Sequence, residues 1–275
     1  MNENIEYPLQ NIIYILIEDY RVRYRHSIPK VAQTPEEFKW EPQLFTSTLS
    51  HLPGLEDQAA ELFGYITYPR FGQLGNDLWY SFRTGKAGLG DDHLCIYRAS
   101  TGKYEPLVGA HLKGVDNNPY IHGLDYRGAR LYTTWVYRGF VWYEGWDDPA
   151  DTKHKQQAGP NSAENNHNIC FAYSDDEGRT WRNGADELIA DVSRGQSIRP
   201  DSPGIVAFEI PKGSGLINQE SQAVDHQGGV HVLNRDNVGG EQRWKHYYRF
   251  PDGGFISYFS LSPLPLAPDV TFHCI

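Results

Sequence analysis

The feature of this sequence that most limits its fold is a pattern of four short β-strand segments that recurs along the chain. In the clearest copy the segments are 120–126, 130–137, 168–174 and one around Trp181, with a polar insertion at 144–166. The same order occurs at 65–70, 78–83, 93–98 and Tyr104, and again at 219–225, 230–234, 244–250 and 255–259. A partial copy lies at 12–18, 22–26 and 40–45. Four antiparallel strands joined by tight turns are typical of one blade of a β-propeller.

One octapeptide, Ser174-x-Asp176-x-Gly178-x-Thr180-Trp181, fixes the turn between the third and fourth strands of the clearest copy. Serine and aspartate side chains hydrogen-bond turn backbone, glycine adopts positive φ, and a tryptophan here packs between blades. The motif therefore predicts a structural hairpin, with no catalytic role of its own.

The sequence as a whole predicts an all-β chain. We expect a single β-propeller domain over residues 1–275, built from four-stranded antiparallel blades, with an irregular Pro-rich tail at 260–275. The repeats amount to about four blades, which predicts an incomplete ring and a truncated chain. An incomplete ring has two open sheet edges, through which the protein could self-associate.

Composition excludes several function classes. The formal net charge of −10 argues against nucleic acid as a partner, and it means that an acidic polymer needs a local basic cluster to bind. Three cysteines are too few, and odd in number, for a disulfide framework. No segment is apolar enough to span a membrane, and residues 12–17 have acidic flanks that a secretory signal lacks, so the residues alone leave localisation unknown.

Four runs of sequence carry a family resemblance: residues 68–92, 117–138, 166–183 and 218–237. They resemble the BNR-repeat, or Asp-box, β-propellers and are similar to the polysaccharide lyases that cut ulvan and related rhamnose–glucuronate polymers. The resemblance implies a carbohydrate-active, extracellular protein that acts on an acidic, uronate-containing polysaccharide by β-elimination and requires no cofactor. It does not separate an active lyase from an inactive or truncated relative.

Such a reaction needs a cation for the uronate carboxylate, a base and an acid. By position in the resemblance, Arg138 is the expected carboxylate clamp, and Tyr120 or His122 the expected acid/base. Arg138 could instead pair with the acidic insertion, and Tyr120 and His122 could serve only in packing. For substrate binding we expect Arg70, Arg83, Trp135 and Tyr137.

The chain departs from the lyase pattern in one respect. The lyases use a pair of histidines early in the propeller, whereas the corresponding segments here are Asp19-Tyr20-Arg21 and the loop 83–90, which contain none. Tyr20 and His26 are the alternatives that the sequence offers.

A structural zinc is a further expectation from the resemblance, because His167 and His231 match two ligand positions. Cys170 is close to His167 in sequence, but residues i and i+3 of a strand point to opposite faces. The sequence shows no four-ligand set with zinc spacing.

Two other functions fit the composition. A non-catalytic carbohydrate-binding propeller could stack sugars on Trp142, Tyr143 and Trp146. A sialidase-type glycoside hydrolase would need three clustered arginines, a Tyr/Glu nucleophile pair and an Asp acid, and the segment 68–71 only mimics the composition of its early signature.

Overall fold

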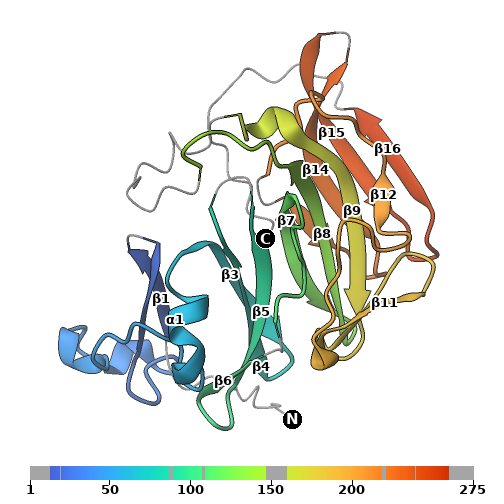
Figure 1. Ribbon diagram of the computed structural model, residues 1–275. Helices are drawn as coiled ribbons and strands as arrows, with labels where there is room; N and C mark the ends of the chain where they lie inside the picture. Colours follow the sequence, from blue (N-terminus) through green and yellow to red (C-terminus); the bar gives the residue numbers. More distant parts are fainter. Residues whose placement is uncertain are drawn as a thin grey trace. The chain divides into compact units, whose positions relative to one another are not determined.

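The computed structural model describes residues 13–18, 20–86, 89–106, 109–146, 160–218, 221–238 and 240–259 as an all-β protein with antiparallel sheets (Figure 1). Its contacts fall into two compact units. The first unit comprises residues 1–84 and 93–107, and the second comprises 85–92 and 108–275. A single domain over the whole chain stays a prediction, and the tail 260–275 lies outside the described residues.

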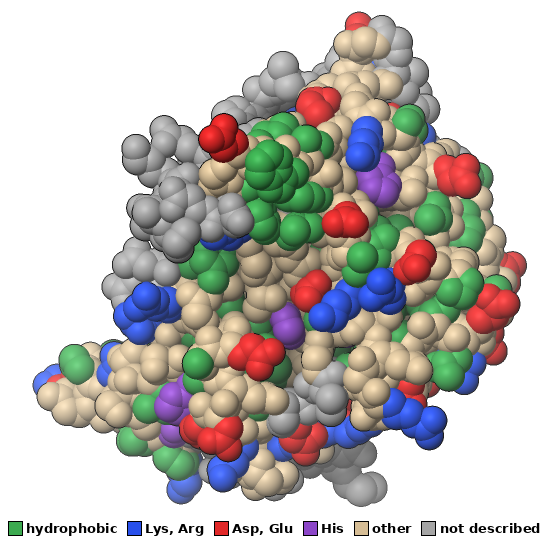
Figure 2. All heavy atoms as spheres, in the orientation of Figure 1, with side chains coloured by type: hydrophobic (Ala, Val, Ile, Leu, Met, Phe, Trp, Pro, Cys, Tyr) green, Lys and Arg blue, Asp and Glu red, His purple; other side chains and the backbone are tan. Residues whose placement is uncertain are grey.

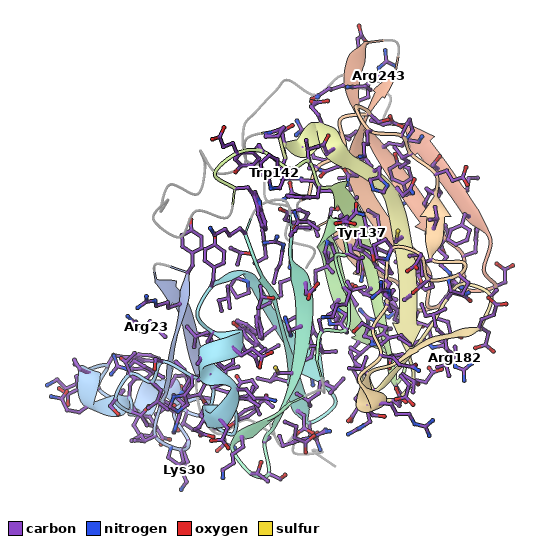
Figure 3. The ribbon with its side chains drawn as sticks, viewed as in Figure 1. Arg23, Lys30, Tyr137, Trp142, Arg182 and Arg243 are labelled. Atoms are coloured by element: carbon purple, nitrogen blue, oxygen red, sulfur yellow. The ribbon has the colours of Figure 1, made fainter. Side chains whose placement is uncertain are left out.

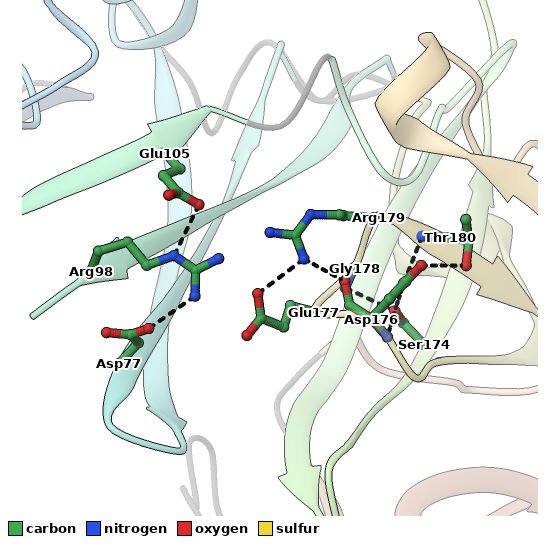
Figure 4. A network of polar contacts seen from close by, with 9 residues as sticks. All are labelled: Asp77, Arg98, Glu105, Ser174, Asp176, Glu177, Gly178, Arg179 and Thr180. Atoms are coloured by element: carbon green, nitrogen blue, oxygen red, sulfur yellow. Dashed lines mark hydrogen bonds and ion pairs between the residues drawn. The ribbon is translucent and has the colours of Figure 1, made fainter. Parts of the chain in front are cut away.

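The first unit contains a hairpin and a four-stranded sheet. The hairpin consists of β1 (Ile13–Glu18) and β2 (Arg21–His26), and after it come 3-10 turns η1 (Pro35–Glu37), η2 (Pro42–Leu44) and η3 (Glu56–Gln58) and helix α1 (Ala59–Leu62). The sheet has the order β3 (Ile66–Leu74), β4 (Asp77–Thr84), β5 (Asp91–Arg98) and β6 (Lys103–Pro106). Its core is aromatic, with Tyr24, Tyr80, Phe82 and Tyr104 buried. Arg98 joins the strands by ion pairs with Asp77 and Glu105, each at 2.9 Å (Figure 4).

The expected strand at residues 40–45 is wrong. Pro42 stands at the start of η2, and its fixed φ favours a helical turn while its missing N–H cannot join a sheet ladder. Only Phe45 forms an isolated bridge, to Ser27.

The second unit contains two sheets. The first has the order β11 (Leu188–Asp191), β10 (Thr180–Arg182), β9 (Asn166–Ser174), β8 (Arg130–Gly139) and β7 (Asn117–Arg127), with β12 (Val206–Phe208) also paired to β9. The second has the order β13 (Gln222–Val224), β14 (Val230–Val238), β15 (Glu241–Arg249) and β16 (Phe255–Phe259). Two short 3-10 turns, η4 (Ala163–Asn165) and η5 (Val192–Arg194), lie in the connections.

The all-β prediction is thus confirmed, and the sheets β3–β6 and β13–β16 each have the four strands expected of a blade. The number of blades, and whether they form a ring, stay predictions. Two of the three cysteines, Cys95 and Cys170, are free and buried. Among the described residues, no helix is long and apolar enough to cross a membrane.

The turn between β9 and β10 has the hydrogen bonds that its sequence predicts (Figure 4). Ser174 Oγ donates to Asp176 Oδ1 at 2.8 Å and accepts from the backbone N–H of Gly178 at 2.8 Å. Asp176 accepts from both the backbone and the hydroxyl of Thr180, at 2.8 and 2.7 Å. Gly178 has φ 86°, and Trp181 is fully buried against the ring of His111, 5.4 Å away. The octapeptide therefore closes the hairpin and anchors it in the core of the second unit.

Candidate functional site

Arg138 lies near the end of β8, with its guanidinium enclosed by neutral oxygen atoms. Nε donates to Asn166 Oδ1 at 2.8 Å, Nη1 to the carbonyl oxygen of Asn161 at 3.3 Å, and Nη2 to Asn218 Oδ1 at 3.0 Å. The guanidinium carbon lies 4.6 Å from the centre of the Tyr120 ring. The side chain is 8% exposed, and no carboxylate of the described residues forms an ion pair with it. Its charge is therefore held in place but is not neutralised by those residues.

The asparagines that hold Arg138 are themselves fixed by backbone. Asn166, at the start of β9, donates from its amide to the carbonyl oxygen of Leu216 at 2.7 Å. Asn161 is fully buried and makes two bonds to Val141, accepting from its N–H at 2.6 Å and donating to its carbonyl oxygen at 2.8 Å. The bond to Leu216 fixes the Asn166 amide so that its oxygen faces the arginine, whereas the bonds to Val141 hold Asn161 so that its backbone carbonyl oxygen does.

The bonds between Asn161 and Val141 also hold the loop that follows β8. Within this loop Phe140 and Trp146 pack edge to face, with ring centres 5.1 Å apart. The next residue after Val141 is Trp142, whose side chain is 66% exposed. Figure 2 shows hydrophobic side chains gathered on the surface in the region where Figure 3 labels Trp142. An exposed aromatic ring is thus attached directly to the segment that holds Arg138.

A second cation, Lys212, lies over Gly139, the residue after Arg138. A Cβ at Gly139 would meet the Lys212 Nζ at 2.3 Å, so the absence of a side chain there lets the ammonium approach. Lys212 is exposed and has no ion-pair partner among the described residues. After burial, its charge is the second cause that lowers the pKa of the nearby His167 imidazole. Lys212 could not be predicted from the sequence, because nothing in residues 211–213 indicates that they meet the end of β8.

Tyr120 and His122, the expected acid/base residues, both lie on β7 and are both buried. Tyr120 pairs with Val136, two residues before Arg138, which explains why its ring reaches the guanidinium. A bulge in the β7–β8 ladder falls at His122, between the pairs formed by Ile121 and Gly123. The structure therefore brings Tyr120 to Arg138, whereas the contacts described below engage both ring nitrogens of His122.

His122 takes part in a hydrogen-bonded chain between the two sheets. Its Nε2 lies 3.0 Å from Asn234 Nδ2, and its Nδ1 lies 3.3 Å from Thr134 Oγ1. Thr134 donates to Gln222 Oε1 at 2.8 Å, and Gln222 donates to Asp125 Oδ2 at 2.7 Å. Burial raises the pKa of Asp125, and the bond from Gln222 opposes that shift.

Trp135 and Tyr137, two of the expected substrate-binding residues, are buried on β8. Their rings meet edge to face at 6.0 Å, and Tyr137 lies beside His167 with ring centres 6.4 Å apart. Figure 3 labels Tyr137 within the sheet, in contrast to the loop residue Trp142. Burial is the main cause that raises the pKa of Tyr137 well above its usual value. In this arrangement the two residues support the strand that carries Arg138.

Arg70 and Arg83 belong to the first unit, where they lie on the paired strands β3 and β4. A bulge between Thr67 and Arg70 interrupts the ladder. Arg70 Nη1 donates to the carbonyl oxygen of Tyr68 at 3.2 Å, and Arg83 Nη1 donates to Thr67 Oγ1 at 3.3 Å. Both side chains are less than 9% exposed.

One histidine near Arg83 was not among the expected site residues. His93 Nε2 lies 3.0 Å from Oγ1 of Thr84, the residue after Arg83, and its ring stacks on Phe82 at 5.3 Å. The sequence predicted only that His93 begins a β-strand, and nothing in it indicated a role for this side chain in a site. The alternatives Tyr20 and His26 also lie in the first unit, where Tyr20 stacks on Tyr65 at 4.8 Å and His26 Nδ1 lies 2.8 Å from the carbonyl oxygen of Ser27.

The two expected zinc ligands lie on different strands with different neighbours. His167 on β9 contacts Asn117, while His231 on β14 lies 2.9 Å from His246 and 3.2 Å from Asp225. Cys170 is buried, which raises the pKa of its thiol and disfavours the thiolate that zinc requires. Within the part of the chain that the structure describes, no group of three or more His, Cys, Asp or Glu residues has the arrangement of a metal site. A structural zinc at these positions stays a prediction, and no step below uses it.

Comparison with solved structures places this fold among known proteins. An ulvan lyase described as a new family of polysaccharide lyase has a TM-score of 0.55 at 13% identity, over 90% of this chain and 57% of that one. Two endo-acting arabinan hydrolases also match. The enzyme from Bacteroides thetaiotaomicron has a TM-score of 0.39 at 11% identity over 94% and 78% of the two chains. The GH43 enzyme from Bacillus licheniformis has 0.25 at 9% over 93% and 94%.

The first of these likenesses shows a shared propeller-type fold, and the other two are too low to carry an argument. The chain spans a little over half the length of the ulvan lyase. No curated protein matches the sequence. A family model described as "BNR repeat-containing family member" matches residues 19–259. Because that match covers most of the sequence, the chain belongs to the BNR repeat-containing family.

Proposed function

We propose that this protein binds a uronate-containing polysaccharide, with the carboxylate of one sugar residue at Arg138. The observation that supports this most is the uncompensated charge of the buried guanidinium, which donates only to neutral oxygens of the described residues. Burying a cation without a counter-charge is costly, so an incoming carboxylate gains more there than at an exposed arginine. Arginine has five N–H donors, of which three are used by the asparagines, so donors remain for the ligand.

The surroundings of Arg138 suit an acidic sugar polymer. Lys212 adds a second positive charge over Gly139, which provides the local basic cluster that a chain of net charge −10 needs for an acidic ligand. Trp142 offers an exposed ring on which the apolar face of a neighbouring sugar can stack. Arg138 and Trp142 are linked through Asn161 and Val141, so the two side chains would contact adjacent sugar units of one polymer.

A second candidate function is β-elimination at the same site, and Tyr120 favours it. In that reaction a base removes the proton next to the uronate carboxylate. The bond to the 4-linked sugar then breaks, a double bond forms in the ring, and the leaving oxygen takes a proton. The base must lie close to the group that neutralises the carboxylate. The ring of Tyr120 lies 4.6 Å from the Arg138 guanidinium carbon, whereas His122 is hydrogen-bonded at both ring nitrogens.

Binding is tested by titrating the protein with uronate oligosaccharides. Arg138→Ala should weaken affinity by about 10- to 100-fold, the range for hydrogen bonds to a charged group. Arg138→Lys, which keeps the charge but not the planar fork, should retain part of it. The matched control is Arg130→Ala, because Arg130 lies on the same strand but is partly exposed and paired with Asp175 at 2.6 Å. Equal affinity of Arg138→Ala and wild type, with both folded, would refute the proposal.

Catalysis is tested on the same polymers by the ultraviolet absorbance of the unsaturated uronate product. A rise that Tyr120→Phe abolishes while affinity is kept would support elimination. Binding without any rise would leave a non-catalytic carbohydrate-binding protein, and sugar release without the chromophore would indicate a hydrolase.

A further inference from the structure

A cavity separate from the Arg138 site lies between the two sheets of the second unit. Its volume is about 260 Å³, and its lining includes Phe171 of β9, Gly184 of the β10–β11 turn, Gly253 of the β15–β16 turn and Phe255 of β16. A water molecule takes up about 30 Å³ of liquid, so the space suits a small polyatomic ion with several waters.

Arg249, the last residue of β15, lies against this cavity. Its guanidinium carbon is 4.3 Å from the ring centre of Phe171 and 5.9 Å from that of Phe255, two of the lining residues. Nη1 donates to the carbonyl oxygen of Phe250 at 3.1 Å, and Nη2 reaches that of Gly184 only at 3.5 Å. The side chain is 8% exposed, and among the described residues its Nε has no hydrogen-bond partner.

The charge of Arg249 also lacks an ion-pair partner in the described part of the chain. Burial is the main cause that lowers the pKa of Arg249. Tyr132, Tyr173 and Asp252 act in the opposite direction, and the charge of Arg130 lowers it further. Asp252 is exposed and accepts a hydrogen bond from the backbone of Gly254. A buried cation with a spare donor and no neutralising carboxylate is a site where an anion is stabilised.

Two glycines leave the guanidinium reachable from the cavity. A Cβ at Gly184 would lie 3.9 Å from Arg249 Nε, and a Cβ at Gly253 would lie 3.8 Å from its Nη2. Side chains at either position would therefore fill the space in front of the donors. Gly253 needs its φ of 97°, which explains a glycine there, but Gly184 has no positive φ, so backbone conformation does not account for it.

We propose that Arg249 and this cavity form an anion-binding site for a small oxyanion, carried either by a free inorganic ion or by an acidic sugar. The site is built from other strand ends than the Arg138 site, and it does not depend on the uronate-binding function. The ring faces of Phe171 and Phe255 hold the guanidinium by cation–π contact, and its unused Nε–H and weakly bonded Nη2 donate to the anion.

The test measures thermal unfolding and titration calorimetry of the full chain with sodium sulfate, sodium phosphate and sodium glucuronate, each against sodium chloride of equal ionic strength. Sulfate stabilises any protein by exclusion from its surface, so only a saturable response that depends on Arg249 counts as binding. Three variants separate the contributions: Arg249→Gln removes the charge, Gly184→Ala fills the space, and Arg243→Gln is the control. Arg243 lies on the same strand but is exposed and paired with Glu241 at 2.7 Å.

We expect wild type and Arg243→Gln to bind at least one of the three anions saturably. Gly184→Ala should weaken that binding by about tenfold or more while unfolding normally in chloride, because its methyl group meets Phe255 at 3.7 Å, an ordinary contact distance. That variant keeps the test valid even if Arg249→Gln does not fold. Preference for glucuronate would identify a sugar carboxylate as the source, and preference for sulfate or phosphate an inorganic ion.

The proposal is overturned if no anion saturates wild type, or if Gly184→Ala binds as tightly as wild type. Arg138→Ala should leave anion binding at Arg249 unchanged, so failure of this site and failure of the uronate site give different results.

Discussion

The side-chain amide of Asn234 donates a hydrogen bond to Nε2 of His122 at 3.0 Å. The direction of this bond is fixed, because Asn234 Oδ1 accepts from the backbone N–H groups of Ile217 and Arg235 at 2.9 and 2.7 Å. His122 must therefore carry its proton on Nδ1, where it donates to Thr134. A histidine held in this tautomer has no free lone pair with which to take a proton from a substrate.

We expect His122→Gln to reduce stability rather than ligand binding. The change leaves buried partners on both sides unsatisfied, at a cost of about 1–3 kcal/mol. Denaturant unfolding measures that loss, and oligosaccharide titration should show affinity within about threefold of wild type. A double-mutant cycle with Asn234→Ala should show strong coupling between the two residues. A variant of normal stability that loses turnover would instead assign His122 to catalysis.

The exposed ring of Trp142 should contribute to affinity without contributing to the fold. Stacking of aromatic groups is worth about 0.5–1.5 kcal/mol, so Trp142→Ala should weaken oligosaccharide binding by about 3- to 10-fold. Its unfolding midpoint should match wild type, because the side chain is 66% exposed. The matched control is Trp40→Ala, at a tryptophan of the first unit that is 54% exposed, which should leave affinity unchanged. Equal losses of affinity in both variants would contradict a specific role of the Trp142 ring in stacking on a sugar.

The β9–β10 turn should depend far more on Asp176 than on its neighbour. Asp176 accepts three hydrogen bonds from Ser174 and Thr180, so Asp176→Ala should cost about 1–3 kcal/mol of unfolding free energy. Asp175 has an exposed ion pair with Arg130, and such pairs contribute about 0–1 kcal/mol. Urea unfolding of the two alanine variants compares them directly. Similar losses would mean that the turn is not held by these bonds.

Stability should fall on mild acidification because of His246. Burial, and then the neighbouring His231, lower the pKa of His246. The unfolded chain takes up this proton near pH 6.5, but the folded protein does so only at a lower pH, so acid favours unfolding. The contribution is complete above about pH 6.5 and is lost as the pH falls toward the folded pKa.

The unfolding free energy of wild type should therefore decrease between about pH 7 and 5 more steeply than that of His246→Gln. His226→Gln, at an exposed histidine of the β13–β14 turn, is the control and should follow wild type. A His246→Gln curve parallel to wild type would show that this group does not couple protonation to folding.

Local patterns predicted much of the fold and part of the site. The octapeptide at 174–181 defines its turn through residues at most seven positions apart, so its hydrogen bonds could be predicted from sequence alone. The position of Arg138 at a strand end, close to Tyr120, followed from the family resemblance. The strand at residues 40–45 was predicted as part of a partial copy of the repeat, but Pro42 favours a helical turn there and cannot donate to a sheet ladder.

What could not be predicted are contacts between distant parts of the chain. Arg138 is held by Asn218, 80 residues away, and His122 by Asn234, 112 residues away. Arg249 shows the same limit, since a single arginine at the end of a strand gives no sign that its partners are rings and glycines from other turns. Such contacts depend on the packing of one sheet on another, which no window of sequence contains.

The bulge in β7 separates two parts of that strand. Every pair on either side of residue 122 is regular: Asn118 and Tyr120 pair with Arg138 and Val136, and Gly123 resumes with Thr134. The ladder would close with the same partners if residue 122 were absent, since a bulge adds one residue to one strand only. The histidine is thus an extra residue in the strand, and its polar network is built without changing the residues opposite the arginine.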